Sequence, residues 1–555
     1  MYVALTMTGL PLLSILIFLP LVGAAVGLFI PRRYGGVLQG WGFAVSLLTF
    51  LLSVPLWYVF DPAQAGFQLE EMASWVPSLG IGYHVGVDGI SLLLVLLTTF
   101  LMPLTFLSAT RSITERVKEF VVLMLVLETA MLGTFLALDL FLFFVFWELT
   151  LVPMYFLIGI WGGPRRIYAA VKFFLYTMTG SVLMLLAIAA LWFLSGGPTG
   201  TGRTFDLVQI LRTPVPRELQ PWLFAAFALA FAIKVPVFPF HTWLPDAHVE
   251  APTAGSVILA AVLLKMGTYG FLRFCLPLFP EASVRAIPLI AVLAVIGIIY
   301  GAVVSAMQRD IKKLVAYSSV SHLGFVMLGM FALTAEAMQG SLLQMVNHGL
   351  STGALFLLVG MIYERAHTRL IPDFGGVAKL MPVYAAFFLI IMFSSAGLPG
   401  TNGFVGEFLI LAGTFKASGL GLQPYAILAG SGVVLSAVYL LWMYQRVFQG
   451  PVRDPLAGAT AETSDTAAPA HVTSAHGAHQ AHEAHGAHGA VAAGHRPGLT
   501  DIGAREIAIL VPIVILVLWI GIYPKPFLDR TAASLTQVSE RVAAAAPSQL
   551  LASAR

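Results

Sequence analysis

Six ionisable side chains lie within stretches of this sequence that are otherwise strongly apolar. They are Glu148, Lys234, Lys265, His322, His348 and Glu407. A charged side chain near the centre of a membrane costs roughly 2.5 kcal/mol or more, so such groups are expected to face a protein interior or water. Carboxyl, amino and imidazole groups in series can pass a proton from one to the next. Proton transfer is therefore the chemistry that this set of residues favours.

Two of these residues lie beside sequences that must interrupt a helix. Lys234 directly precedes Val-Pro-Val-Phe-Pro, so we expect it at the C-terminal end of a half-helix, where free carbonyls favour a cation. Glu407 follows the glycine-rich stretch 397–403, and we expect it in the first turn of the resumed helix, where free amides favour a carboxylate. Broken helices with opposite charges at their breaks are typical of transporters.

The two histidines have polar neighbours at helical spacing. His348 shares one predicted helix face with Gln344, Ser351 and Thr352, and His322 has serines close by. A buried histidine that is simply satisfied by hydrogen bonds is the alternative for each of them. Because two such histidines occur on adjacent spans, the pattern favours a proton relay.

Four further ionisable residues are secondary candidates for the same path. Glu128 lies in an apolar span, where a structural pairing is the alternative. Lys172 lies close to two arginines and can instead extend its ammonium group to the membrane surface. His241 and His248 flank the interrupted helix after Lys234 and belong either to a proton uptake path or to a cap of that helix.

Composition defines the class of protein that holds these groups. Of the 555 residues, 58% are hydrophobic and 10% are charged, and mean hydropathy is +0.88, whereas a soluble protein carries roughly 25% charge. The chain is therefore an all-α polytopic membrane protein. Its net charge of +3 does not indicate nucleic-acid binding. One cysteine, Cys275, leaves no ligand set for an iron–sulfur cluster, so we expect no cofactor in this chain.

Fourteen apolar stretches are long enough to cross a membrane as helices of about 20 residues. They are residues 10–30, 37–60, 88–108, 119–137, 140–160, 168–194, 221–244, 253–275, 286–306, 314–333, 340–363, 382–415, 425–447 and 505–523. The seventh contains Pro236 and Pro239, and the twelfth is too long for one straight helix. Both are expected to be discontinuous.

The loops predict orientation, because odd-numbered loops carry more Lys and Arg than even-numbered ones. In a bacterium this puts the odd loops in the cytoplasm and both termini on the periplasmic side of the plasma membrane.

An internal repeat is also indicated, because Leu244-Pro245 recurs as Leu398-Pro399. The predicted organisation is helices one to three in 1–118, a first five-helix repeat in 119–275, a second and inverted repeat in 286–450, a loop in 451–504, and helix fourteen with the C-terminal tail in 505–555.

The loop 451–504 differs in composition from the rest of the chain. It is rich in Ala, Gly and His, cannot build a core, and is expected to be a disordered cytoplasmic segment. Its regularly spaced histidines are His476, His479, His482, His485 and His488. Metal binding by these imidazoles is the weaker alternative, because nothing nearby would fix the ligand geometry.

Three segments resemble the antiporter-like membrane subunits of respiratory complex I. They are 146–156 (FWELTLVPMYF), 234–253 (KVPVFPFHTWLPDAHVEAPT) and 310–324 (DIKKLVAYSSVSHLG). The resemblance covers about residues 85–450 and is closest to the M-type subunit, because L- and N-type subunits carry a lysine at the position of Glu407. The resemblance implies two inverted five-helix repeats and one proton pathway, coupled to NADH oxidation and quinone reduction in partner subunits that hold FMN and iron–sulfur clusters. L- and N-type neighbours and small membrane subunits would be the partners.

The same resemblance implies residue roles. Glu148 would pair with Lys234 and relay a signal from the neighbouring subunit, and Lys234 would be the central switch. Lys265 and His322 would connect two half-channels, His348 would extend the path, and Glu407 would be the terminal group.

Three alternatives to this assignment remain. The chain could belong to a multisubunit sodium/proton antiporter or to a membrane-bound energy-converting hydrogenase, both of which differ in partners. It could also be a membrane scaffold without transport, which would have no reason to keep charges in hydrocarbon.

Overall fold

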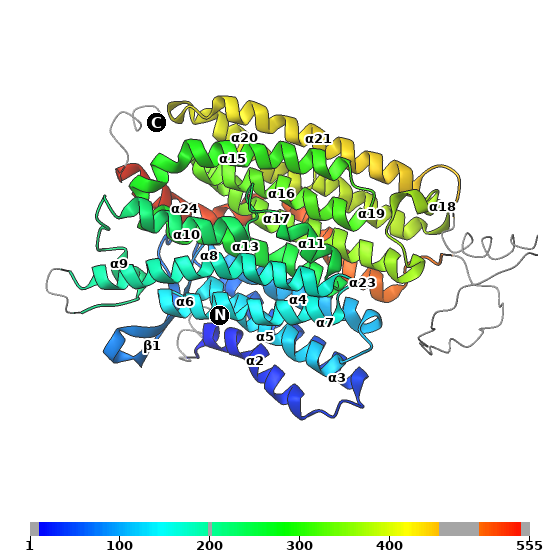
Figure 1. Cartoon of the computed structure of the whole chain (residues 1–555), viewed down its shortest axis with the longest axis horizontal. Helices are drawn as coiled ribbons and strands as arrows, with labels where there is room; N and C mark the ends of the chain where they lie inside the picture. Colours follow the sequence, from blue (N-terminus) through cyan, green and yellow to red (C-terminus); the bar gives the residue numbers. More distant parts are fainter. Residues whose placement is uncertain (1–9, 198–201, 454–498, 546–555) are drawn as a thin grey trace, which may run out of the picture.

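The computed structural model describes residues 10–197, 202–453 and 499–545, which form a bundle of long helices (Figure 1). Among these residues, twelve helices are long and apolar enough to cross a membrane. Two shorter apolar helices, Gln220–Lys234 and Pro382–Ser395, belong to the two stretches that were expected to be discontinuous. The predicted polytopic helical fold is therefore confirmed.

The helices of the bundle overlap every stretch that hydropathy predicts. They are α2 (Leu12–Phe29), α3 (Gly35–Val59), α4 (Ser91–Ser112), α5 (Val117–Leu136), α6 (Leu140–Leu149) with α7 (Leu151–Trp161), α8 (Arg166–Ser195), α10 (Gln220–Lys234) with α11 (Trp243–Glu250), α12 (Thr253–Ile258) with α13 (Leu264–Gly270) and α14 (Leu276–Leu278), α15 (Pro280–Ala306), α16 (Ile311–Phe331), α17 (Ala335–Ala366), α19 (Pro382–Ser395) with α20 (Asn402–Lys416), α21 (Gln423–Phe448) and α23 (Ala504–Ile522). The shorter elements are β1 (Gln68–Val76), β2 (Ile81–Val87), α9 (Leu207–Ile210), α18 (Val377–Leu380) and α24 (Lys525–Ala545).

Both predicted interruptions are present. Lys234 is the last residue of α10, as the proline pattern after it predicts, and eight residues separate it from the start of α11 at Trp243. The second interruption separates α19 from α20, and there Gly397 and Gly400 have φ of 75° and 90°. Backbone in this region strains any residue with a β-carbon, which explains glycine at both positions.

A β-hairpin outside the bundle was not predicted. β1 and β2 pair antiparallel, so the all-α class needs this one addition. His84 of β2 holds the hairpin in place, because its Nδ1 is 2.6 Å from Asp206 Oδ2 and its Nε2 is 2.9 Å from Glu70 Oε2. Asp206 caps α9, so the imidazole joins the hairpin to the loop before α10.

Helix α24 also lies outside the prediction, since its sequence is too polar to register as a span. It packs on one end of the bundle through Phe527, Leu535 and Val542. Its polar side chains bond to the ends of other helices. Ser534 Oγ accepts from the Gly89 amide at 3.1 Å, and Arg541 Nε donates to the Pro277 carbonyl at 2.7 Å.

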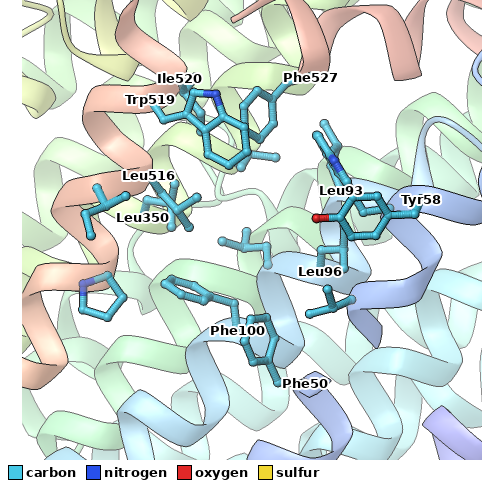
Figure 2. Close-up of a pocket in the computed structure, with 16 residues that line it drawn as sticks. Phe50, Tyr58, Leu93, Leu96, Phe100, Leu350, Leu516, Trp519, Ile520 and Phe527 are labelled. Carbon is cyan, nitrogen blue, oxygen red and sulfur yellow. The ribbon is translucent and has the colours of Figure 1, made fainter. Parts of the chain in front are cut away.

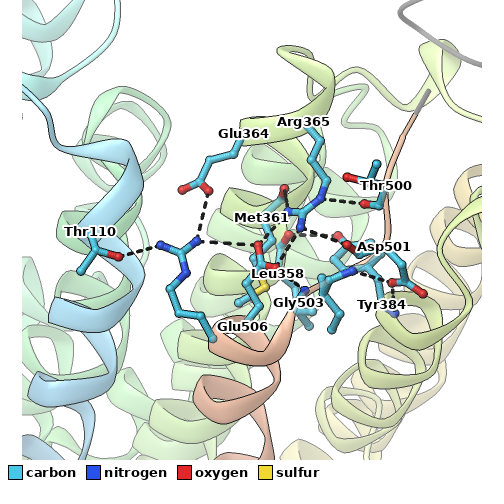
Figure 3. A network of polar contacts seen from close by, with 12 residues as sticks. Thr110, Leu358, Met361, Glu364, Arg365, Tyr384, Thr500, Asp501, Gly503 and Glu506 are labelled. Atoms are coloured by element: carbon cyan, nitrogen blue, oxygen red, sulfur yellow. Dashed lines mark hydrogen bonds and ion pairs between the residues drawn. The ribbon is translucent and has the colours of Figure 1, made fainter. Parts of the chain in front are cut away.

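A polar network fastens α23 to three other helices at the opposite end (Figure 3). Arg365 of α17 donates both terminal nitrogens to the Glu506 carboxylate at 2.8 Å. Asp501 accepts from the first amides of α19 at 2.8 and 3.0 Å, and Arg505 donates to Thr110 of α4 at 2.7 Å. This network therefore defines where α23 joins the bundle.

Candidate functional site

Lys234 lies in a buried aromatic setting at the end of α10. Its side chain is 1% exposed. Its Nζ donates to Thr150 Oγ1 at 3.4 Å and lies 5.2 Å from the centre of the Trp147 ring and 5.7 Å from that of Phe173. Ring faces attract a cation, so these contacts partly replace the water that an ammonium loses on burial.

Glu148 is close to this group but does not contact it. Among the described residues no ion pair within 4 Å joins Glu148 to Lys234, and Glu148 Oε1 has no hydrogen-bond partner. The helical hydrogen bonding is interrupted here, at Thr150 between α6 and α7, where Pro153 lacks the amide that would bond to the Leu149 carbonyl. The direct contact of Lys234 is therefore with Thr150, and the pairing of Glu148 with Lys234 that the family resemblance implies stays a prediction.

Lys265 makes the next contact of the series. Its Nζ is 2.6 Å from His348 Nδ1 and donates to the Ala260 carbonyl at 2.6 Å. Ala260 lies in a π-helical turn, 259–263, within the α12–α14 span. Turns of this kind shift a helix by one residue and are frequent at functional sites. Nothing in the hydropathy pattern indicated it.

His348 and His322 connect Lys265 to Glu407 on α20. Their ring centres are 5.9 Å apart, and His322 Nδ1 lies 2.8 Å from Glu407 Oε1. The observed order is therefore Lys265, His348, His322 and Glu407. The family resemblance implies that Lys265 and His322 connect two half-channels and that His348 extends the path; in the structure His348 lies between Lys265 and His322, and the roles stay predictions.

Glu407 is not in the first turn of α20, so the expectation that it lies there is wrong. The interruption is short and α20 already begins at Asn402, which puts Glu407 in the second turn. Its carboxylate is instead bound by side chains, since Oε1 accepts from Gln344 Nε2 at 3.1 Å as well as contacting His322. Close approach of α17 requires Gly406, where a β-carbon would lie 2.2 Å from Gln344 Oε1.

The predicted polar face of α17 lines a small polar cavity between these helices. His322, Gln344, His348, Ser351 and Thr352 all line it. The second ring nitrogens of both histidines and the second carboxylate oxygen of Glu407 are buried and have no partner among the described residues. The two histidines thus each keep one unused ring nitrogen beside the cavity, and Glu407 keeps one unused oxygen next to His322.

The secondary candidates lie apart from this series. Glu128 of α5 is fully buried, and neither carboxylate oxygen has a partner among the described residues. Lys172 pairs with Asp246 at 2.7 Å, a contact that supports a structural role. His241 stacks on Phe238 with ring centres 5.6 Å apart. His248 stacks on Phe356 at 4.7 Å, and both its ring nitrogens lack a partner in the described chain.

Sequence reasoning missed several polar residues of the site. Thr150 contacts Lys234, and Asn347 donates to the Asn402 carbonyl at 2.7 Å, which ties α17 to the interrupted helix. Lys312 is buried, donates to the Ala251 carbonyl at 2.6 Å and lines the same cavity as Glu250. Lys312 and Lys313 stand together at the start of α16, a pattern typical of lysines at the membrane surface. The sequence therefore did not indicate that Lys312 is buried.

No cluster of metal ligands occurs among the described residues. The histidine tract His476–His488 lies outside them, within 454–498, and so the metal alternative for that tract stays a prediction.

Comparison with known proteins gives consistent matches. The family described as NADH:quinone oxidoreductase/Mrp antiporter, transmembrane, matches residues 137–433. The chain is 43% identical over 544 residues to NADH-quinone oxidoreductase subunit M of Rhodobacter capsulatus, across 95% of this chain and 96% of that protein. It is 42% identical over 518 residues to NADH-ubiquinone oxidoreductase chain 4 of Arabidopsis thaliana, across 93% and 94% of the two chains.

A solved structure agrees with these sequence matches. A chain of respiratory complex I from Thermus thermophilus with bound NADH superposes with a TM-score of 0.80 at 32% identity, covering 96% of this chain and 99% of that one. Nearly the whole chain is thus similar to these proteins in both sequence and fold. The chain therefore belongs to the NADH:quinone oxidoreductase/Mrp antiporter transmembrane family, and within it to the M-type subunits.

Proposed function

We propose that this chain is the proton-translocating M-type membrane subunit of an NADH:quinone oxidoreductase and moves protons along the axis of Lys234, Lys265, His348, His322 and Glu407. One observation carries the proposal. The last four of these residues, from four different helices, follow one another through two contacts of 2.6 and 2.8 Å and one pair of rings 5.9 Å apart. A scaffold would gain nothing from burying this series.

The atoms of the axis suit transfer in sequence. A proton on Lys265 Nζ passes to His348 Nδ1, which it contacts. His348 releases a proton from Nε2 and His322 takes one at its own Nε2, through a water in the polar cavity that both rings line. His322 Nδ1 then delivers a proton to Glu407 Oε1. Each imidazole accepts at one nitrogen and releases at the other, as a relay requires.

Coupling would act at Glu148 and Lys234. A charged Glu148 stabilises the ammonium of Lys234, and neutralising or withdrawing that carboxylate weakens its hold on the proton. Electron transfer would take place in partner subunits that hold FMN and iron–sulfur clusters. L- and N-type neighbours would transmit the resulting signal to Glu148, where it changes the charge or the position of the carboxylate.

Proton uptake would begin at the end of α11. Glu250, Lys312 and Arg369 line a polar cavity there, and His248 is two residues from Glu250 with both ring nitrogens free in the described chain. The loop charges put this end in the cytoplasm and both termini on the periplasmic side of a bacterial plasma membrane.

A lysine variant tests the proposal. Lys234→Ala should remove proton translocation from the purified assembly in proteoliposomes, because the ammonium next to Glu148 is lost. Lys379→Ala is the control, since Lys379 is an exposed lysine of α18. Full proton stoichiometry in Lys234→Ala would contradict the proposal.

Purification in mild detergent separates the remaining assignments. Co-purification with FMN, iron–sulfur proteins and NADH:quinone activity supports the oxidoreductase. Co-purification with membrane chains alone supports the sodium/proton antiporter instead, and a hydrogenase metal centre supports the energy-converting hydrogenase.

A further inference from the structure

We propose that the groove between α3, α4, α17 and α23, closed at one end by α24, binds one acyl chain of a phospholipid with an anionic headgroup. The groove encloses about 1,130 Å³ including its open mouth. Figure 2 shows Trp519 and Phe527 at one end of it, and Phe50 and Phe100 at the other. This site is separate from the proton axis and goes beyond the function proposed above.

The walls of the groove are hydrocarbon and aromatic rings. Sixteen residues line it, and the few polar atoms among them belong to a tyrosine hydroxyl and tryptophan N–H groups. Along the bundle it extends from Phe50 to Tyr58 on α3 and from Pro512 to Ile520 on α23. Eight residues of helix rise about 12 Å, against about 15 Å for one leaflet of a membrane whose hydrocarbon core is about 30 Å thick. The groove therefore fits most of one acyl chain within a single leaflet.

The mouth of the groove is open on the outer surface of the bundle. Tyr58 is 70% exposed and Ile515 is 57% exposed, so in a membrane both contact lipid. An apolar recess that opens to hydrocarbon is not filled by water, because water there has no polar partners. Lipid tails are the molecules present at that depth.

The aromatic end of the groove has the features of a membrane interface. Trp57, Trp519 and Phe527 form a cluster with ring centres 5.1 to 6.4 Å apart. Tryptophan prefers the headgroup level of a bilayer. The polar helix α24 begins directly beside this cluster, and so the acyl chain would enter the groove from the surface that α24 covers.

Arg530 of α24 supplies the charge for the headgroup. Its guanidinium lies 3.7 Å from the centre of the Trp57 ring. Three of its N–H groups donate to the carbonyls of Trp57 and Pro526, which leaves two of five donors. Among the described residues, no carboxylate forms an ion pair with Arg530 within 4 Å. A free positive charge with two unused donors suits a phosphate.

Occupancy has a consequence for the helix that carries His348. Val346 and Leu350 of α17 form the floor of the groove, on the side of α17 that faces away from the polar cavity. Leu97 packs closely on Gly349 of the same helix. An acyl chain in the groove therefore completes the packing behind His348.

Photo-crosslinking of the purified native assembly in nanodiscs tests the proposal. The probes are phosphatidylglycerol and phosphatidylethanolamine that carry a photoactivatable group in one acyl chain. Adducts are expected on peptides that contain 93–100 and 512–520, about fivefold more with phosphatidylglycerol, since one basic group near the surface contributes about that factor. Adducts no more frequent there than on the exposed face of α21 would overturn the proposal, and so would lipid adducts found on a neighbouring protein chain in place of these two peptides.

Two variants sharpen the result. Leu96→Trp fills the groove and should remove most adducts from both peptides. Arg530→Gln keeps the groove and should abolish the preference for phosphatidylglycerol. The matched control is Ile427→Trp, because Ile427 is 66% exposed on α21 and far from the groove. Unchanged adducts in Leu96→Trp, or an unchanged headgroup preference in Arg530→Gln, would each contradict the corresponding half of the proposal.

Discussion

Gly406→Ala should weaken the site around Glu407 without removing any ionisable group. The added β-carbon would lie 2.2 Å from Gln344 Oε1 and 2.9 Å from Asn347 Nδ2, so Gln344 must move. Two hydrogen bonds depend on its position: Gln344 to Glu407 at 3.1 Å and Asn347 to Gln344 at 3.1 Å. A neutral bond contributes about 1 kcal/mol and a bond to a charged group about 1.5–3 kcal/mol. Alanine regains about 1 kcal/mol of helix propensity, which leaves a net loss of about 1.5–3 kcal/mol.

The assay is thermal unfolding of the purified assembly together with proton translocation. The control is Gly430→Ala on α21, where a β-carbon would meet nothing within 4 Å and the helix should be slightly more stable. Gly406→Ala should unfold at a lower temperature and translocate protons more slowly than the control. If the two variants were equally stable and equally active, the close packing of α17 on α20 would not hold Glu407 as described.

Two further predictions concern parts of the chain that support the site. Burial lowers the pKa of His84, but the carboxylates of Asp206 and Glu70 outweigh it and raise the pKa above the ordinary 6.5. The stabilisation by His84 is then full below about pH 6.5 and is lost as pH rises through the folded-state pKa. The difference in melting temperature between wild type and His84→Gln should therefore shrink with rising pH, and a constant difference would contradict this. Arg365→Met should destabilise the junction of α17 and α23 by about 1–3 kcal/mol, because it removes two charged hydrogen bonds from the buried Glu506 carboxylate, which keeps the Gly503 amide at 2.8 Å and the Arg505 guanidinium at 3.8 Å. Adding Glu506→Met should restore part of that loss in urea unfolding, and no recovery would contradict the role of the pair.

The sequence was most informative where a residue is energetically unfavourable in its segment, such as an ionisable group in an apolar span. The presence of ionisable groups in apolar stretches marked four side chains that the structure brings into contact or close proximity, Lys265, His348, His322 and Glu407. Prolines after Lys234 correctly predicted the end of α10, because proline cannot continue the backbone bonding of a helix. The functional roles of these residues stay predictions.

Features that depend on packing between helices could not be predicted. The order of His348 and His322 follows from which helix lies between two others, and helical periodicity contains no such information. Glu407 was expected one turn too early, since the pattern of glycines shows that a break exists but not where the helix resumes. The β-hairpin and α24 lack strong hydropathy signals, and their positions depend on single contacts such as those of His84 and Ser534.

Proton translocation by His348→Gln tests the central claim most directly, because His348 is the contact between Lys265 and the pair of His322 and Glu407. Glutamine can still hydrogen-bond to Lys265 but cannot exchange a proton. The control is His367→Asn, an exposed residue in left-handed backbone just after the end of the same helix. In proteoliposomes energised by NADH and quinone, the account predicts that His348→Gln loses about tenfold or more of its translocation rate through this subunit, with the assembly intact and the control unchanged. Wild-type proton stoichiometry in His348→Gln would contradict the proposed axis.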